Sequence, residues 1–498
     1  MRFGRKQASY ILLAGLFVAV LLLAQVFLGM HRSAVSKDSS PQPADAGEQP
    51  TSGLTPFNEL LSPEPSNQAG GQRVIAFEDV NVIPMEDERV LEHQTVITRG
   101  GTIAEVGPAA RVKIPKDAVR IDGRGKYLMP GLLDMHVHIH HPEYLLLYVA
   151  SGVTTVRNMK GEPRHLEWRA RIAKGEMLGP TIYTTGQILD GDPPFGRGGE
   201  IVRNSKEAER AVAEHKRAGY DFIKVYNNLS KESYDAIIAA GKKYNTQIVG
   251  HVPLELGLEY ALKSRQHSIE HVENFIYAYF HDDLDAGKIP HIAKAVSDAG
   301  VWICPTLVTF QYVVLQTEHG PDLKELLQMP ELKYISPSVR QSWLPENNNY
   351  VTRFEGNETR RGNAARRFRR QLEFLKLVTK GLRDAGARLV TGTDSTFPFV
   401  LPGFSILEEI RLFVEVGFTP FEAIRAATRD AAECLKGMDE FGTIATGKRA
   451  DMILLSANPL DNVANLKNRA GVMVRGKWYT EGELQNRLNS LADSYKTP

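Results

Sequence analysis

Residues 130–140 read PGLLDMHVHIH, and the pattern of the chain changes at this stretch. Before it, from Arg73 onward, short β-forming segments alternate with turns, which is typical of a small antiparallel β domain. After it, apolar strand-like segments alternate with amphipathic helical stretches. This alternation is typical of βα units around a parallel sheet, so the sequence predicts an α/β chain.

Eight strand-like segments follow one another in this second part, with helical stretches between them. They are LLDMHVHI (132–139), VTTVRNM (153–159), TIYTTG (181–186), DFIKVYN (221–227), QIVGHV (247–252), SIEHVEN (268–274), WICPTL (302–307) and RLVTGTD (388–394). Eight strand–helix units predict a (β/α)8 TIM barrel, which we place at residues 132–435.

The β pattern returns after the barrel, in GTIATGKRADMILLSA (442–457) and GVMVRGKWYT (471–480). We expect residues 73–131 and residues 436–498 to form one small β-sandwich domain together. The barrel is then an insertion into a discontinuous domain.

Residues 1–30 resemble a signal-anchor, because basic residues at positions 2–6 precede an uncharged run over residues 10–30. A membrane-spanning helix needs about 20 apolar residues, whereas a cleavable signal has an apolar core of about 7–15. We therefore expect an uncleaved N-terminal transmembrane helix, with a cleaved signal as the alternative. The basic flank predicts a cytoplasmic N-terminus and an exported catalytic body, periplasmic or extracellular. Residues 31–72, rich in Pro, Ser, Gln and Gly, predict a disordered linker.

The composition excludes several classes of protein. Sixty Lys and Arg residues balance 59 Asp and Glu residues, for a net charge of +1, which argues against a nucleic-acid-binding surface. Two cysteines, Cys304 and Cys434, cannot form a disulfide framework, and we expect buried free thiols. A homo-oligomer is compatible with this sequence.

Polar residues interrupt the apolar barrel strands near their C-terminal ends. They are His136, His138, Lys224, His251, His271 and Asp394. Residues two apart on a strand face the same way, and the C-terminal ends of barrel strands form the active-site mouth. Burying such groups costs free energy unless they are paired or bind a metal. The set predicts a metal site, with Zn²⁺ best suited to the imidazoles and Mn²⁺, Fe²⁺ or Co²⁺ fitting comparable geometry.

These strand ends resemble the metal-dependent amidohydrolase superfamily, in the group similar to imidazolonepropionase and to Xaa-Pro or Xaa-Arg dipeptidases. The stretches that carry the resemblance include PGLLDMHVHIH, YDFIKVYNN, SIEHVENF, LVTGTDS and GTIATGKRADMILLSANPL. Three positions depart from the usual pattern: Asn158 replaces a frequent Asp, GHVP (250–253) follows the fifth strand, and EHVEN (270–274) follows the sixth. The first departure leaves the metal set intact, and the other two change the pocket wall and leave the substrate open.

The resemblance implies a binuclear metal centre. His136, His138 and Asp394 would bind the first ion, and His251 and His271 the second. Lys224, carboxylated by CO2, would bridge the two ions, which are expected to be zinc. The alternative is a mononuclear centre of the imidazolonepropionase type, in which this lysine would be unnecessary.

The resemblance also implies a hydrolase of C–N bonds acting on small amides, dipeptides, N-acyl amino acids or cyclic amides. A metal-activated hydroxide would attack the carbonyl while Asp394 acts as general base and acid and His271 helps to polarise the carbonyl. Tyr226 and Arg157 are the candidate substrate-binding residues. The alternatives are a mononuclear cyclic amidase, or an esterase, lactonase or phosphotriesterase activity at the same site.

Two further features stay open at this point. The connection over residues 308–387 contains an arginine-rich helical stretch, which is either a solvated helix face or an element that covers the substrate entrance. Glu273 and Asn274 follow the sixth strand and are candidates to orient His271. His140 and His141 are expected to be non-ligands.

Overall fold

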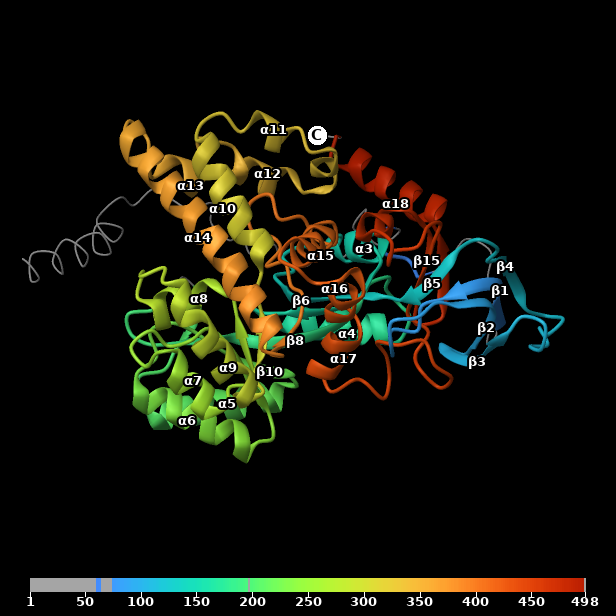
Figure 1. Ribbon diagram of the computed structural model, residues 1–498, viewed down its shortest axis with the longest axis horizontal. Helices are drawn as coiled ribbons and strands as arrows, with labels where there is room; N and C mark the ends of the chain where they lie inside the picture. Colours follow the sequence, from blue (N-terminus) through green and yellow to red (C-terminus); the bar gives the residue numbers. More distant parts are fainter. Residues whose placement is uncertain (1–59, 64–73, 196–197, 497–498) are drawn as a thin grey trace, which may run out of the picture. The chain divides into compact units, whose positions relative to one another are not determined.

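The segments after Pro130 form a parallel sheet in the computed structural model, which describes residues 60–63, 74–195 and 198–496 (Figure 1). Its strands are β6 (Leu132–Val137), β7 (Val153–Asn158), β8 (Thr181–Asp190), β10 (Phe222–Val225), β11 (Gln247–Gly250), β12 (Ser268–Glu270), β13 (Trp302–Cys304) and β14 (Arg388–Leu389). They pair in sequence order, each parallel to the next, and β9 (Glu200–Ile201) adds to β8. Seven of the eight lie within a segment predicted from the sequence, and β8 starts with its predicted segment, 181–186, and runs four residues beyond it.

The chain after β14 returns to the first strand of this sheet. The amide of Met135 donates to the carbonyl of Thr391 at 3.0 Å, and the amide of Asp394 donates to the carbonyl of His136 at 2.7 Å. A parallel bridge joins Val137 to Ser395. The mixed α/β fold with this parallel sheet is consistent with the predicted (β/α)8 barrel.

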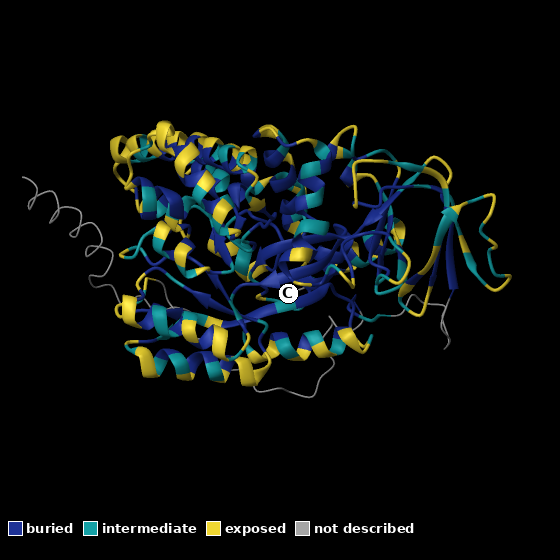
Figure 2. Cartoon of the chain, turned by 60° about the horizontal axis from the view of Figure 1, so that its bottom comes forward, coloured by how far each residue is buried: buried dark blue, intermediate teal, exposed yellow. Residues whose placement is uncertain are grey.

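Helices connect the strands and cover the outside of the sheet, with their buried faces inward and exposed faces outward (Figure 2). The main ones are α3 (Tyr144–Ala150), α4 (Pro163–Ala173), α5 (Ser205–Ala218), α6 (Lys231–Lys243), α7 (Leu258–Ser264), α9 (Ile289–Ala299), α15 (Ser405–Glu415), α16 (Pro420–Ala426) and α17 (Arg429–Cys434). Local signals start and stop them: Asn204 caps α5 through the amide of Glu207, and Gly219 ends it with a φ of 94°. Thr419 and Glu422 form a capping box on α16.

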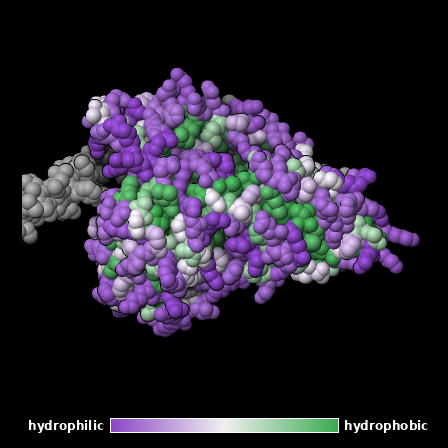
Figure 3. Space-filling view, viewed as in Figure 1, coloured by the Kyte–Doolittle hydropathy of each residue, from purple (hydrophilic) through white to green (hydrophobic). Residues whose placement is uncertain are grey.

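The long connection between β13 and β14 is helical. It contains α10 (Leu307–His319), α11 (Lys324–Leu327), α12 (Pro337–Trp343), α13 (Asn349–Thr352) and α14 (Glu358–Asp384). Helix α14 runs alongside α10 in Figure 1 and buries an apolar stripe that includes Phe368, Leu372, Leu375 and Val378. Hydrophilic side chains predominate at the end of the view where α13 and α14 lie (Figure 3).

Strands from both sides of the barrel segment build a second sheet. It contains β1 (Val74–Val82), β2 (Leu91–Arg99), β3 (Thr102–Pro108), β4 (Val119–Asp122), β5 (Tyr127–Pro130), β15 (Met452–Leu455), β16 (Arg469–Val474) and β17 (Lys477–Thr480). The antiparallel pair of β5 and β15 joins the two parts of the chain. Phe77 on β1 meets Trp478 on β17 with ring centroids 5.2 Å apart, although three strands separate β1 from β17 in the sheet. The sheet therefore curls over and packs against itself.

The predicted N-terminal anchor, residues 1–30, lies outside the described residues, as does most of the predicted linker. Within the described part of the chain, no helix is both long and apolar enough to cross a membrane. Both cysteines are buried and free, as expected from their number.

Candidate metal centre

Six predicted residues converge at the C-terminal ends of the parallel strands. His136 and His138 lie at the end of β6, Lys224 on β10, His251 after β11, His271 after β12 and Asp394 after β14. Because parallel strands end at the same edge of a sheet, these side chains meet although they come from five strands.

Asp394 is the point at which the first group of donors meets. Its Oδ1 lies 2.9 Å from Nε2 of His138 and 3.4 Å from Nε2 of His136. The Nζ atom of Lys224 lies 3.4 Å from the same Nε2 of His136. The structure thus brings together His136, His138, Lys224 and Asp394 as predicted from the spacing of the strand ends.

The remaining two imidazoles complete the cluster. The ring of His271 lies 4.5 Å from that of His136 and 4.8 Å from that of His251, measured between centroids. One ligand atom each from His136, His271 and Asp394 falls within 4.8 Å of the others, close enough for a shared metal ion.

Two of these residues have backbone angles that few L-residues adopt. His271 has a φ of 63° and Asp394 a φ of 57°, both in the left-handed region, and Thr306 next to them has a φ of 51°. Such conformations cost about 1–3 kcal/mol each and persist only where the surrounding structure enforces them. The fold therefore bends sharply at two strand ends to aim these side chains at the cluster.

Burial keeps the four imidazoles of the cluster neutral at neutral pH. Burial and nearby positive charge lower the pKa of His136 and His251 well below 6.5, and burial lowers the pKa of His138 and His271. Burial also lowers the pKa of Lys224 to about 8. An imidazole must be neutral to bind a metal, so these shifts favour ligation at neutral pH.

Asp394 is the anionic member of the cluster. Burial raises its pKa, but the hydrogen bond with His138 and the charges of His271 and Lys224 outweigh burial and leave the pKa below 3.8. The carboxylate is therefore ionised at neutral pH and available as a ligand or as a proton acceptor.

Two side chains that the sequence analysis did not identify contact the outer nitrogens of His136 and His251. Nδ1 of His136 lies 2.9 Å from Oε2 of Glu270, and Nδ1 of His251 lies 2.6 Å from Oδ1 of Asn227. These contacts leave Nε2 of each ring to face the cluster, which is how outer partners orient metal-binding histidines. Glu270 and Asn227 both occur within the quoted strand motifs, close to the predicted ligands. This proximity in the sequence is the signal by which they could have been predicted.

Of the two residues predicted to orient His271, Asn274 contacts its main chain, and Glu273 binds elsewhere. The main-chain amide of Asn274 donates to the carbonyl of His271 at 2.9 Å, whereas Glu273 accepts a hydrogen bond from the hydroxyl of Tyr277 at 2.8 Å. The partner of the His271 ring is Thr306, whose hydroxyl lies 2.7 Å from Nδ1 and which comes from the loop after β13. Sequence distance hid this partner, because Thr306 follows the neighbouring strand.

The prediction that Arg157 binds substrate was also wrong. Its side chain is fully buried; Nη2 donates to Oε1 of Glu270 at 2.7 Å, and Nε donates to the carbonyl of Met135 at 2.7 Å. Arg157 therefore neutralises the charge of Glu270, and its own charge lowers the pKa of His136 and of Lys224.

Tyr226 lies beside the cluster, as its position two residues after Lys224 suggested. Its ring is 3.9 Å from that of His251 and 5.8 Å from that of Phe195, which is 53% exposed. Burial, with the charge of Asp394, raises the pKa of the Tyr226 hydroxyl, so it remains a hydrogen-bond donor at neutral pH. His140 is exposed and outside the donor set.

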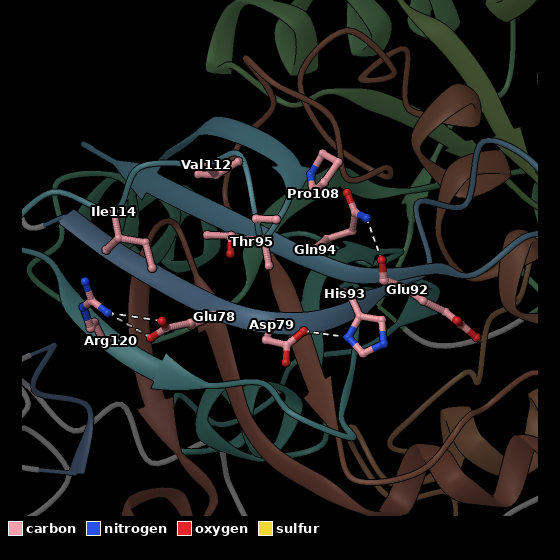
Figure 4. A pocket seen from close by; sticks show the side chains of 12 residues that line it. Glu78, Asp79, Glu92, His93, Gln94, Thr95, Pro108, Val112, Ile114 and Arg120 are labelled. Atoms are coloured by element: carbon pink, nitrogen blue, oxygen red, sulfur yellow. Dashed lines mark hydrogen bonds and ion pairs between the residues drawn. The ribbon is translucent and has the colours of Figure 1, made fainter.

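A separate cavity of about 610 Å³ lies on the curled sheet, lined by residues of β1, β2 and β4 and of the loop after β3 (Figure 4). Two ion pairs lie among its side chains. Arg120 binds Glu78 at 3.1 Å, and His93 binds Asp79 at 2.7 Å. It contains none of the metal-centre residues.

Known proteins share this architecture. An adenine deaminase of Staphylothermus marinus is 28% identical over 447 residues, which cover 85% of this chain and 60% of the deaminase, so the chain spans less than two thirds of that relative. An ochratoxinase of Aspergillus niger is 23% identical, over 76% of this chain and 80% of its own length.

Solved structures match over most of the chain. A Xaa-Pro dipeptidase with bound methionine has a TM-score of 0.63 at 21% identity, covering 82% of this chain and all of its own. Bottromycin amidohydrolase has a TM-score of 0.69 at 23% identity, covering 94% of this chain and 96% of its own. At this identity the structural likeness shows the fold alone. The family model for amidohydrolases matches residues 127–479, and the chain belongs to the amidohydrolase family.

Proposed function

We propose that this protein is a metal-dependent hydrolase that cleaves C–N bonds in small amides, with dipeptides, N-acyl amino acids and cyclic amides as candidate substrates. The convergence of four histidines, one lysine and one aspartate at the strand ends carries this proposal. Family membership supports the reaction class, as do relatives named as a deaminase and a dipeptidase.

The donor set fits two divalent ions. His136, His138 and Asp394 would hold one ion, and His251 and His271 the other. Neutral imidazoles with a carboxylate suit Zn²⁺, and also Mn²⁺, Fe²⁺ or Co²⁺. When bound, such ions polarise a carbonyl group and lower the pKa of water.

Lys224 would change its charge to share this site with two cations, because an ammonium 3.4 Å from Nε2 of His136 would repel both. Reaction of the neutral amine with CO2 yields a carbamate, which is anionic and has two oxygens to offer. A pKa of about 8 leaves part of the Lys224 population neutral near pH 7, as this reaction needs. We therefore propose a carboxylated Lys224, with a mononuclear centre and a free Lys224 amine as the alternative.

Asp394 would transfer the proton. As an ionised carboxylate it can accept a proton from the attacking water at one oxygen and return it to the leaving nitrogen. Tyr226 would donate a hydrogen bond to the substrate, since its hydroxyl stays protonated at neutral pH.

The test combines metal content with the mass of the native protein. Two metal ions per chain, and a mass increment of one CO2 that Lys224→Ala abolishes, support the binuclear site. Lys231→Ala is the matched control, because Lys231 lies on the surface and pairs with Asp235. One ion with no effect of Lys224→Ala supports the mononuclear alternative. Absence of metal after loading, together with no hydrolysis of dipeptides, N-acetyl amino acids or cyclic amides, refutes the proposal.

A further inference from the structure

The helical connection between β13 and β14 contributes an arginine held by aromatic rings. Arg353 follows α13, and its guanidinium carbon lies 4.4 Å from the ring centroid of Tyr350, 5.1 Å from that of Phe354 and 5.6 Å from that of Phe368. Stacking of this kind restrains the guanidinium while its N–H groups stay available. The Arg353 side chain is exposed.

Arg353 has no carboxylate partner within residues 60–63, 74–195 and 198–496, and neither have Arg360 and Arg367 of the same connection. Two others are paired, since Arg361 binds Glu358 and Arg369 binds Glu318. The protein surrounding Arg353 lowers its pKa, and the positive charges of Arg367 and Arg360 lower it further. Several positive charges that no carboxylate balances favour an incoming anion.

A chain of contacts links Arg353 to the metal centre. The Tyr350 ring, which supports Arg353, lies 5.1 Å from the ring of Phe397, and the amide of Phe397 donates to the carbonyl of Asp394 at 3.0 Å. Burial raises the pKa of the Tyr350 hydroxyl to about 12, while the charge of Arg353 lowers it and those of Glu273 and Asp394 raise it. Tyr350 therefore lies within the electrostatic reach of both Arg353 and the donor cluster.

Acidic side chains lie in the same region. Glu273 follows His271 by two residues and accepts a hydrogen bond from the hydroxyl of Tyr277, and burial raises its pKa. Asp394 would repel a negative substrate group, whereas Arg353 would attract it. An anionic end of a substrate is therefore favoured beside Arg353 and away from Asp394.

We propose that Arg353 is a specificity-determining residue, which binds a carboxylate on the substrate at the end remote from the C–N bond that is cleaved. The proposal rests on the proposed function and narrows its substrates to amides with a free carboxylate, such as N-acyl amino acids and peptides with an ionised C-terminus. A guanidinium fork matches the two oxygens of a carboxylate, and Tyr350 holds that fork in position.

The test measures equilibrium binding of two probes that the enzyme does not hydrolyse, N-methanesulfonyl-L-phenylalanine and its carboxamide, to the metal-loaded full chain by titration calorimetry. We expect the wild-type protein to prefer the acid. Arg353→Met should weaken binding of the acid by about 10- to 100-fold, the range of a lost charge-assisted contact, and change carboxamide binding less than about twofold. Arg353→Lys should retain part of the preference.

Arg370→Ala is the control, because Arg370 lies on α14, is exposed and should leave both affinities unchanged. Equal binding of acid and carboxamide by the wild-type protein, or unchanged binding by Arg353→Met, overturns the proposal. So does an equal loss for both probes, which indicates a structural role. Because binding is measured without turnover, the two proposals can fail separately. A protein that prefers the acid probe but hydrolyses no amide would refute the proposed function and support the anion site at Arg353. Where hydrolysis is present, KM for N-acetyl-L-phenylalanine should rise in Arg353→Met and kcat should change little.

Discussion

Glu270 contacts both a buried arginine and a histidine of the candidate metal centre, and mutation can separate these two contacts. One carboxylate oxygen binds Nη2 of Arg157 at 2.7 Å and the other lies 2.9 Å from Nδ1 of His136, and all three side chains are fully buried. Glu270→Gln keeps the shape and can still accept from Nδ1 of His136. It removes the negative charge, so Arg157 becomes an uncompensated buried cation.

Breaking a buried ion pair by removing one partner costs about 3–5 kcal/mol. The compact unit spans Thr55–Pro498, and at about 2.1 cal/mol/K per residue its unfolding entropy is roughly 0.9 kcal/mol/K. The expected fall in Tm is therefore about 3–5 °C for Glu270→Gln. Weakening the outer partner of a metal-binding histidine lowers metal affinity by about 10- to 100-fold.

The double variant Arg157→Met/Glu270→Gln separates the role of Glu270 in stability, through Arg157, from its role in metal affinity, through His136. Removing both charges takes away the penalty of the unpaired arginine, so Tm should recover by more than half. Metal affinity should stay low, because His136 still lacks its carboxylate. Thermal unfolding in the presence of a chelator measures the first quantity, and competition with a chromogenic zinc chelator measures the second.

Two outcomes would refute this reasoning. If the double variant is as unstable as Glu270→Gln, the loss does not arise from an unpaired Arg157. If the double variant regains wild-type metal affinity, Glu270 does not act on the metal centre through His136.

Three further predictions concern the same cluster. Thr306→Ala should lower metal affinity by about 10-fold, because Nδ1 of His271 loses its partner 2.7 Å away, and Thr306→Ser should restore it; equal affinities in a chelator competition would contradict this. Asp394→Asn should lower kcat by about 10²-fold or more when the metal content is matched to wild type, because the amide cannot accept the proton; near-normal kcat would exclude Asp394 as the base. The free energy of unfolding of the metal-free protein should fall as the pH drops through 6.5, because burial lowers the pKa of His136 and His251 in the folded state and the unfolded chain then binds more protons. Denaturant melts at pH 7.5 and 5.5 test this, and His251→Gln should show a smaller pH dependence than wild type.

Local patterns in the sequence were enough to predict the strands of the parallel sheet and the six residues of the cluster. Each strand is a short apolar run that ends in polar residues, and parallel strands place their C-terminal ends at one edge. His136, Lys224 and Asp394 could therefore be placed together although they are far apart along the chain. The same reasoning placed Tyr226 beside the cluster, because it shares a face of its strand with Lys224.

Tertiary structure decided which side chains support that cluster. The sequence places Arg157 near the end of a strand, but it does not show that this side chain is buried and forms an ion pair with Glu270. Thr306 reaches His271 from the loop after the neighbouring strand, and Arg353 stacks on Tyr350 within a separate helical connection. Such contacts depend on how side chains from distant segments pack and become buried together. The sequence alone determined the residues of the cluster, because parallel strands align their C-terminal ends at one edge. Their hydrogen-bond partners were determined only in the folded chain, because burial and distance arise from packing.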